Sequence, residues 1–189
     1  QKEVKGEIET VLFEVNRQMS TYDPASEISR FNQFEDFNTW FPVSELFAAT
    51  TARALRFSEI SNGSFDPTVG PLVNLWGFGP GTSSEALPTD DAIALAMSTV
   101  GFSAIDVRES DTVVGSAIQK KAERYLDLSA IAKGLGVDEI YALLQYLPVP
   151  KNLPRSKSGK KIQRHKNSRN LTDVLLKLHS TYTTGDVLG

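Results

Sequence analysis

The sequence predicts an α/β fold of the mixed α+β kind, in which a small sheet lies among several helices. Apolar residues recur at helical spacing over residues 2–19, 44–61 and 130–147. Short segments typical of strands precede the last helix, over 104–108, 112–121 and 124–129. The order is helices, a long loop, a small meander and a final helix, which favours this fold class.

The elements follow from local signals. The first helix covers 2–19, and Ser26 is expected to cap a short second helix. The next helix begins after Ser44 and ends at Asn62-Gly63, where the backbone becomes free to turn. A short helix is expected around 70–76.

The same kinds of local signal predict the elements from Thr89 to residue 147. Thr89 caps a further helix that ends at Gly101, and two aspartates follow the cap, where the helix dipole favours negative charge. The helix over 130–147 comes after the three strands. With 189 residues and 40% hydrophobic content, the chain has enough apolar material for a packed core.

Charge is spread unevenly. Residues 1–150 hold 11 Lys or Arg and 21 Asp or Glu, whereas residues 151–189 hold nine and two, with both histidines. Such asymmetry indicates a tail with its own partner or a segment foreign to the rest. The stretch "PVPKNLPRSKSGKKIQRHKNSR" is rich in proline and basic residues, a composition that favours disorder.

Composition excludes several kinds of site. The absence of cysteine excludes disulfides, zinc–thiolate sites and thiol catalysis. The formal net charge of −3 argues against a nucleic-acid role for the whole chain. No apolar run approaches the ~20 residues of a membrane span. The chain opens at Gln1 in helix-like sequence without a signal peptide, so we expect its natural N-terminus to lie upstream.

The stretch "LDLSAIAKGLGVDEI", residues 126–140, predicts an anion or nucleotide site. Asp127 ends a strand-like run that enters a helix, a place where α/β proteins often bind ligands. Lys133 lies near the start of that helix, where the dipole disfavours a cation unless an anion such as phosphate is also bound. A backbone carbonyl at this turn could ligate Mg²⁺. The alternatives are a solvated lysine and an internal Asp127–Lys133 pair.

The stretch "GSFDPTVGPLVNLWGFGP", residues 63–80, suggests a pocket wall. Asp66 precedes Pro67, which favours an extended backbone and a carboxylate with a fixed direction. Trp76 and Phe78 flank Gly77, which lets a planar group approach closely. The alternative is a turn-rich core segment with buried aromatic side chains.

The stretch "MSTYDPASEISRFN", residues 19–32, places Tyr22 in a polar turn. An aromatic ring there can stack on a heterocycle, or it can lie over the adjacent core. Glu27 and Arg30 are three residues apart and are expected to form a local ion pair.

In this order and spacing, the three stretches resemble the ApbE family, the FAD:protein FMN transferases, over about residues 1–147. The resemblance implies a bilobed α/β fold with a flavin between the lobes. It implies FAD as substrate, Mg²⁺ as cofactor, and a phosphoester link from FMN to a Thr or Ser of an acceptor protein. It also implies a periplasmic position or the outer face of the cytoplasmic membrane, often as a lipoprotein, with subunits of membrane redox pumps as acceptors. No nucleic acid is expected.

The resemblance also implies site residues but assigns no catalytic residue. Ala130 matches the position whose backbone carbonyl ligates Mg²⁺. The residues that match FAD contacts are Tyr22, Ser64, Phe65, Asp66, Asp127 and Lys133.

Residues 148–189 depart from the family pattern. The expected "GGE"-type strand, the "HTIDP"-like segment and the stretch with the remaining Mg²⁺ ligands are not found after Leu147. We therefore expect a truncated or frame-shifted chain with a basic, disordered tail and little transferase activity. A lineage-specific tail is the alternative. A non-catalytic FAD-binding module and an interaction protein that uses the basic tail are the competing functions.

Overall fold

The computed structural model describes residues 2–79, 87–110 and 115–146. Their contacts divide the chain into two units. The larger unit contains residues 13–134, and the other contains residues 2–12 together with the described residues from 135 to 146. The predicted basic tail at 148–189 lies outside the described residues, so its order remains a prediction.

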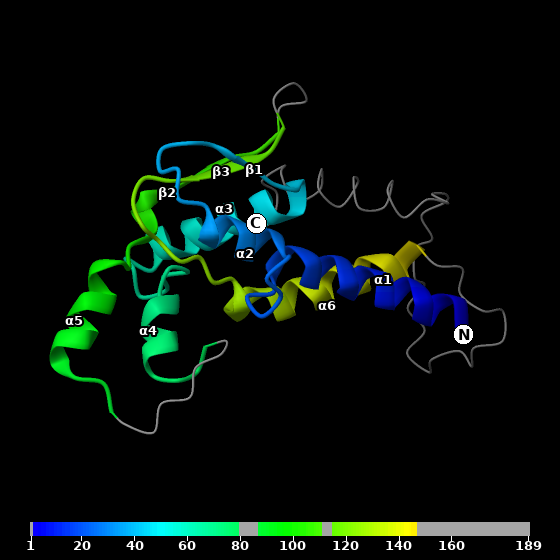
Figure 1. The fold of residues 1–189 in the computed structure, drawn as a ribbon. Helices are drawn as coiled ribbons and strands as arrows, with labels where there is room; N and C mark the ends of the chain where they lie inside the picture. Colours follow the sequence, from blue (N-terminus) through cyan, green and yellow to red (C-terminus); the bar gives the residue numbers. More distant parts are fainter. Residues whose placement is uncertain (1, 80–86, 111–114, 147–189) are drawn as a thin grey trace. The chain divides into compact units, whose positions relative to one another are not determined.

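The predicted helices are all present. The three long helices match the predicted ranges closely: α1 (Lys2–Met19), α3 (Glu45–Ile60) and α6 (Ser129–Tyr146). Three short helices also match: α2 (Glu27–Gln33), α4 (Gly70–Leu75) and α5 (Asp90–Ser98) (Figure 1). The spacing of apolar residues, together with cap residues and glycines, therefore predicts where the helices lie.

The three predicted N-caps are confirmed. The hydroxyl of Ser26 accepts a hydrogen bond from the backbone N–H of Ser29, at 3.1 Å. Ser44 and Thr89 do the same at the starts of α3 and α5. A cap hydroxyl satisfies an N–H that has no partner within the helix, which is why these residue types begin helices.

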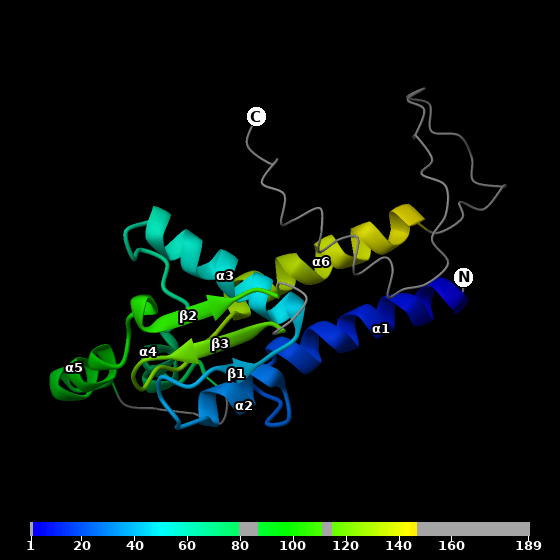
Figure 2. The same cartoon turned by 90° about the horizontal axis from the view of Figure 1, so that it is seen from above.

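The sheet is small and antiparallel, with the strand order β1-β3-β2 (Figure 2). Its strands are β1 (Phe41–Pro42), β2 (Ile105–Arg108) and β3 (Ala117–Lys120). A 3₁₀ turn, η1 (Phe102–Ala104), leads into β2. The strands predicted over 104–108 and 112–121 correspond to β2 and β3, although residues 111–114 lie outside the described residues. The two-residue strand β1 was not predicted, because it is short and contains a proline.

The strand predicted over 124–129 is wrong. Residues 124–128 pair with no strand among the described residues, and Ser129 already belongs to α6. The backbone N–H of Leu126 donates to the side chain of Asn32, and the N–H of Asp127 donates to the carbonyl of Pro67. A side chain and a loop carbonyl, and not a neighbouring strand, therefore accept the backbone hydrogen bonds of this segment. Buried backbone N–H groups need such partners.

The core of the larger unit lies where α2 and α3 meet the sheet. Helix α3 packs against β2. Five of the large side chains that are fully buried are Phe31, Phe47, Ile118, Leu126 and Leu128. Each such side chain contributes roughly 1.5–3 kcal/mol through its removal from water. The burial of Leu126 and Leu128 thus anchors the segment that enters α6.

The predicted Glu27–Arg30 pair is wrong. Glu27 is buried, and its carboxylate accepts from Arg17 at 3.2 Å and from the backbone N–H of Ser44 at 2.9 Å. Arg17 also bonds to Glu14, at 2.9 Å. The buried carboxylate therefore links the end of α1 to the start of α3, which a local spacing rule does not predict.

The smaller unit pairs the first part of α1 with the last part of α6. Val11, Ala142 and Leu143 are buried. A methyl group added at Gly136 would stand 3.6 Å from Leu12 Cδ2, an ordinary van der Waals contact, so the two segments are neighbours there. Among the described residues, none of the helices is long and apolar enough to cross a membrane.

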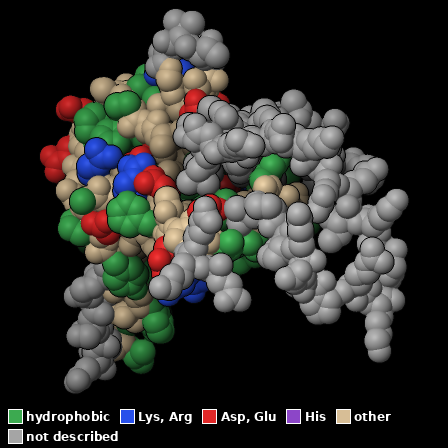
Figure 3. All heavy atoms as spheres, turned by 90° about the vertical axis from the view of Figure 1, so that its right-hand side faces the viewer, with side chains coloured by type: hydrophobic (Ala, Val, Ile, Leu, Met, Phe, Trp, Pro, Cys, Tyr) green, Lys and Arg blue, Asp and Glu red, His purple; other side chains and the backbone are tan. Residues whose placement is uncertain are grey.

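Hydrophobic side chains also reach the surface. On the face in Figure 3, several of them lie beside acidic and basic side chains. Phe13, Phe57 and Phe78 are among the exposed aromatic residues. Scattered apolar side chains are normal on a protein surface, so this face by itself identifies no partner.

Candidate functional site

The three sequence motifs meet at residues 125–128. The side-chain amide of Asn32 donates to the carbonyl of Leu126 at 2.9 Å and accepts from its N–H at 2.8 Å. The carbonyl of Pro67 accepts from the N–H of Asp127 at 2.7 Å. Asn32 is the last residue of the stretch 19–32, and Pro67 belongs to the stretch 63–80. Hydrogen bonds therefore join both of these stretches to the start of the stretch 126–140.

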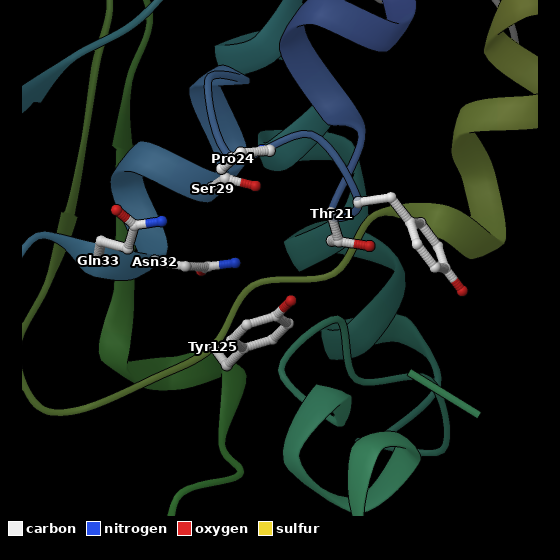
Figure 4. Close-up of a pocket in the computed structure, with 7 residues that line it drawn as sticks. Thr21, Pro24, Ser29, Asn32, Gln33 and Tyr125 are labelled. Atoms are coloured by element: carbon white, nitrogen blue, oxygen red, sulfur yellow. The ribbon is translucent and has the colours of Figure 1, made fainter. Parts of the chain in front are cut away.

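An open pocket of about 170 Å³ lies beside this junction. It is lined by Thr21, Tyr22, Pro24, Ser29, Asn32, Gln33 and Tyr125. Figure 4 shows Thr21 and Asn32 on opposite sides of the pocket, with the Tyr125 hydroxyl pointing between them. Pockets for whole drug-sized ligands have volumes of roughly 300 Å³ or more. This pocket therefore has room for one part of a dinucleotide and not for all of it.

Tyr22 lies at the pocket, as a stacking residue requires. Its side chain is 70% exposed, so the alternative of a tyrosine that covers the core is wrong. An exposed aromatic face beside a pocket can stack on a planar ring. The contact with FAD itself stays a prediction.

Tyr125 was not singled out from the sequence, yet it forms one side of the pocket. Burial raises the pKa of its hydroxyl, and the nearby charge of Asp127 raises this pKa further, whereas a hydrogen bond with Thr21 acts in the opposite direction. A methyl group on Gly70 would overlap Cδ1 of the ring and would stand 2.8 Å from Cε1. No local pattern indicates Tyr125, because its neighbours come from distant segments.

Asp127 is held at the entrance to α6. Its Oδ1 accepts from the backbone N–H of Ser129 at 2.8 Å and also from the Ser129 hydroxyl. The ion pairs found among the described residues do not include Asp127 with Lys133, so the alternative of an internal pair is wrong. Lys133 is exposed in the second turn of α6. Its ammonium group is therefore accessible to a ligand from solvent.

Ala130 is exposed and is the second residue of α6. Mg²⁺ takes six oxygen ligands, often including one or two carboxylates and several waters. In residues 2–79, 87–110 and 115–146, no three His, Asp or Glu side chains gather as a metal site. The carbonyl of Ala130 and the neighbouring Asp127 do not make a complete set, so the described residues alone do not fit a Mg²⁺ centre.

Asp66 binds within the chain. Its Oδ1 accepts from the N–H and the hydroxyl of Thr68, at 2.7 and 2.6 Å, and its Oδ2 accepts from the N–H of Phe102 at 3.1 Å. The predicted fixed direction of this carboxylate is confirmed. These bonds hold the turn of the second motif against the start of η1. A contact of Asp66 with FAD stays a prediction and would add to this structural role.

Ser64 and Phe65 follow a sharp turn at the end of α3. Asn62 and Gly63 have φ angles of 51° and 78°, which only residues tolerant of the left-handed region adopt readily. Ser64 is exposed, and the N–H of Phe65 donates to the Ser61 hydroxyl at 3.0 Å. Neither residue lines the pocket beside Tyr22. Their contacts with FAD stay a prediction.

Trp76 and Phe78 are 45% and 77% exposed, so the alternative of buried aromatic side chains is wrong for both. Gly77 between them has a φ of 80°, as a glycine allows. Neither ring lines the pocket beside Tyr22. The proposed wall for a planar ligand at this place stays a prediction.

Comparison with known proteins agrees with the resemblance seen in the sequence. Residues 1–152 match the model of the ApbE family. The chain belongs to the ApbE family. It is 45% identical over 143 residues to an FAD:protein FMN transferase of Haemophilus influenzae and 42% identical over 145 residues to one of Vibrio cholerae. These alignments cover 75% and 76% of this chain but 40% and 41% of the relatives, so the chain spans about 40% of their length.

Solved structures confirm the fold of this part. The flavin transferase ApbE from Vibrio cholerae matches with a TM-score of 0.71 and 40% identity over 77% of this chain and 45% of that one. The flavinyl transferase ApbE of Pseudomonas stutzeri matches with a TM-score of 0.69 and 32% identity, over 77% and 46%. The predicted mixed fold is confirmed as helices with a small antiparallel sheet, which correspond to part of these ApbE structures.

Proposed function

We propose that this chain forms the FAD-binding part of a Mg²⁺-dependent FAD:protein FMN transferase. One observation supports this most directly: hydrogen bonds join all three family motifs at residues 125–128, next to the pocket at Tyr22. The names of the relatives support the proposed reaction class, and the pocket supports the proposed position of one part of the substrate.

In this proposal, different residues bind different parts of FAD. Tyr22 stacks on a planar ring of FAD, since its face is exposed at the pocket. Lys133 and the start of α6 neutralise phosphate charge, because a helix N-terminus and an ammonium group both attract anions. In the reaction, the acceptor hydroxyl oxygen bonds to the FMN phosphorus, the pyrophosphate P–O bond breaks, AMP leaves, and the hydroxyl proton passes to solvent or base.

Magnesium dependence rests on the carbonyl of Ala130 together with ligands outside the described residues. When bound, the ion would supply charge neutralisation at the pyrophosphate. Since the family stretches that would carry the remaining Mg²⁺ ligands are not found in the sequence after Leu147, we expect weak turnover or none from the 189 residues alone. Acceptors among membrane redox-pump subunits, a periplasmic position and a lipid anchor belong to the same proposal and rest on the family resemblance.

The lack of a group of three metal-binding side chains among the described residues favours a second candidate, a module that binds FAD without cleaving it. Both candidates are tested by titrating the full chain with FAD, with and without Mg²⁺, while flavin fluorescence and released AMP are measured. Saturable binding supports the proposed site. AMP release that requires Mg²⁺ identifies a transferase, and binding without AMP identifies the module. The absence of saturable binding would overturn both.

A further inference from the structure

We propose that Asn32 is a positioning residue for FAD binding, an inference that rests on the proposed function. Its amide sets the course of residues 125–128 and thereby places Tyr125, Asp127 and the start of α6 at the site. Nothing in the sequence signals this role, because Asn32 and Leu126 are 94 residues apart.

The first support is the geometry of the amide. Its nitrogen donates to the Leu126 carbonyl and its oxygen accepts from the Leu126 N–H, at 2.9 and 2.8 Å. The side chain thus repeats the paired bonds that a neighbouring strand would make. Both polar atoms of the amide are engaged by the protein, so Asn32 acts on the ligand through the segment that it holds.

The second support is that Asn32 is itself held from another element. The ammonium of Lys120, on β3, donates to the Asn32 carbonyl at 2.9 Å. This lysine is only 3% exposed, and its charge lies 5.2 Å from the centroid of the Phe31 ring. An anchor fixed at both its backbone and its side chain transmits position, because neither end is free to adjust.

The third support comes from the residues on either side of Leu126. Tyr125 lies one residue before Leu126 and lines the pocket. Asp127 lies one residue after it and begins the turn into α6, where its carboxylate binds Ser129. A shift of Leu126 therefore moves the pocket side and the helix entrance together.

The test compares two Asn32 variants with a control that lowers stability away from the pocket. Asn32→Ala removes the amide, and Asn32→Leu removes it while keeping a branched side chain with the same number of heavy atoms, which guards against a variant that fails to fold. Phe47→Leu is the control, because Phe47 is fully buried on α3 and does not line the pocket. FAD affinity is measured by flavin fluorescence at a temperature where circular dichroism shows every protein folded.

A misplacement of about 1 Å can cost an enzyme on the order of a hundredfold in rate, which shows how sensitive a site is to position. We expect both Asn32 variants to lose about tenfold or more in FAD affinity, which is at least one decade in Kd. Phe47→Leu is expected to keep its affinity although its unfolding temperature falls. The pKa of the Tyr125 hydroxyl, which is raised in the wild type, should also fall towards its ordinary value in the Asn32 variants.

The outcomes separate this inference from the proposed function. If the wild-type chain binds FAD and the Asn32 variants bind equally well, the positioning role is wrong and the proposed function stands. If affinity falls equally in Phe47→Leu, the effect is general instability and the positioning role is again wrong. If the wild-type chain does not bind FAD, the proposed function fails and the inference fails with it.

Discussion

The ring of Tyr125 occupies the space in which a side chain on Gly70 would stand. A methyl group there would overlap Cδ1 and would lie 2.8 Å from Cε1. Gly70 is the first residue of α4, and Tyr125 belongs to the segment that enters α6. The glycine in the second motif thus makes room for the residue that forms one side of the pocket.

Gly70→Ala is therefore expected to lower the free energy of unfolding by about 1–3 kcal/mol, the usual cost of overpacking. Gly134→Ala is the matched control, since Gly134 is exposed in α6 and a methyl group there meets nothing within 4 Å. That change should stabilise by up to ~1 kcal/mol through helix propensity. Urea denaturation measures both, and equal effects of the two changes would contradict the packing described for Tyr125.

The pKa of Tyr125 lies above its ordinary value of 10.0, mainly because burial disfavours the phenolate. Folding therefore favours the protonated phenol. This stabilisation is complete below pH 10 and is lost as pH rises through the raised folded pKa. In spectroscopic titration, the difference between the wild type and Tyr125→Phe should show phenolate formation with a midpoint above pH 10. Tyr141→Phe removes an exposed phenol as the control, and a Tyr125 midpoint at or below 10 would refute the buried environment.

Glu27 and Glu14 both bind Arg17 but are expected to differ in their contribution to stability. Glu27 is 5% exposed and also accepts from the N–H of Ser44. Glu27→Ala should lower the free energy of unfolding by about 2 kcal/mol, because it removes two hydrogen bonds to a buried carboxylate and leaves their part-buried donors without this acceptor. Glu14→Ala breaks a partly exposed pair and should cost below ~1 kcal/mol. Chemical denaturation decides this, and a larger loss from Glu14→Ala would show that Glu27 does not link α1 to α3.

The helices could be predicted because their signals are local. Ser26, Ser44 and Thr89 cap the helices that they precede, and apolar spacing gives the long ranges. The strand at 124–129 was wrong for the opposite reason. Its composition suits a strand, but its partners are the Asn32 side chain and the Pro67 carbonyl, which only the folded chain brings near.

The candidate site was predictable in part. Tyr22 lies at the pocket, and Asp127 and Lys133 lie at the entrance and second turn of α6, as the motifs indicated. Tyr125 and Asn32 were missed, since their importance comes from contacts between distant segments. Asp66 shows a limit of motif reasoning, because its carboxylate binds Thr68 and Phe102 within the protein whether or not it also meets a ligand.

The central claim is that FAD binds where the three motifs meet, with its phosphates at the start of α6. The most direct measurement is a parallel FAD titration of the wild type, Lys133→Ala and Lys5→Ala. Lys5 is an exposed lysine on α1 that pairs with Glu9, so it controls for the loss of one positive charge. The account predicts weaker binding by about fivefold or more for Lys133→Ala, which is ~1 kcal/mol, and no change for Lys5→Ala. Equal affinities in all three proteins would contradict the placement of the phosphates at Lys133.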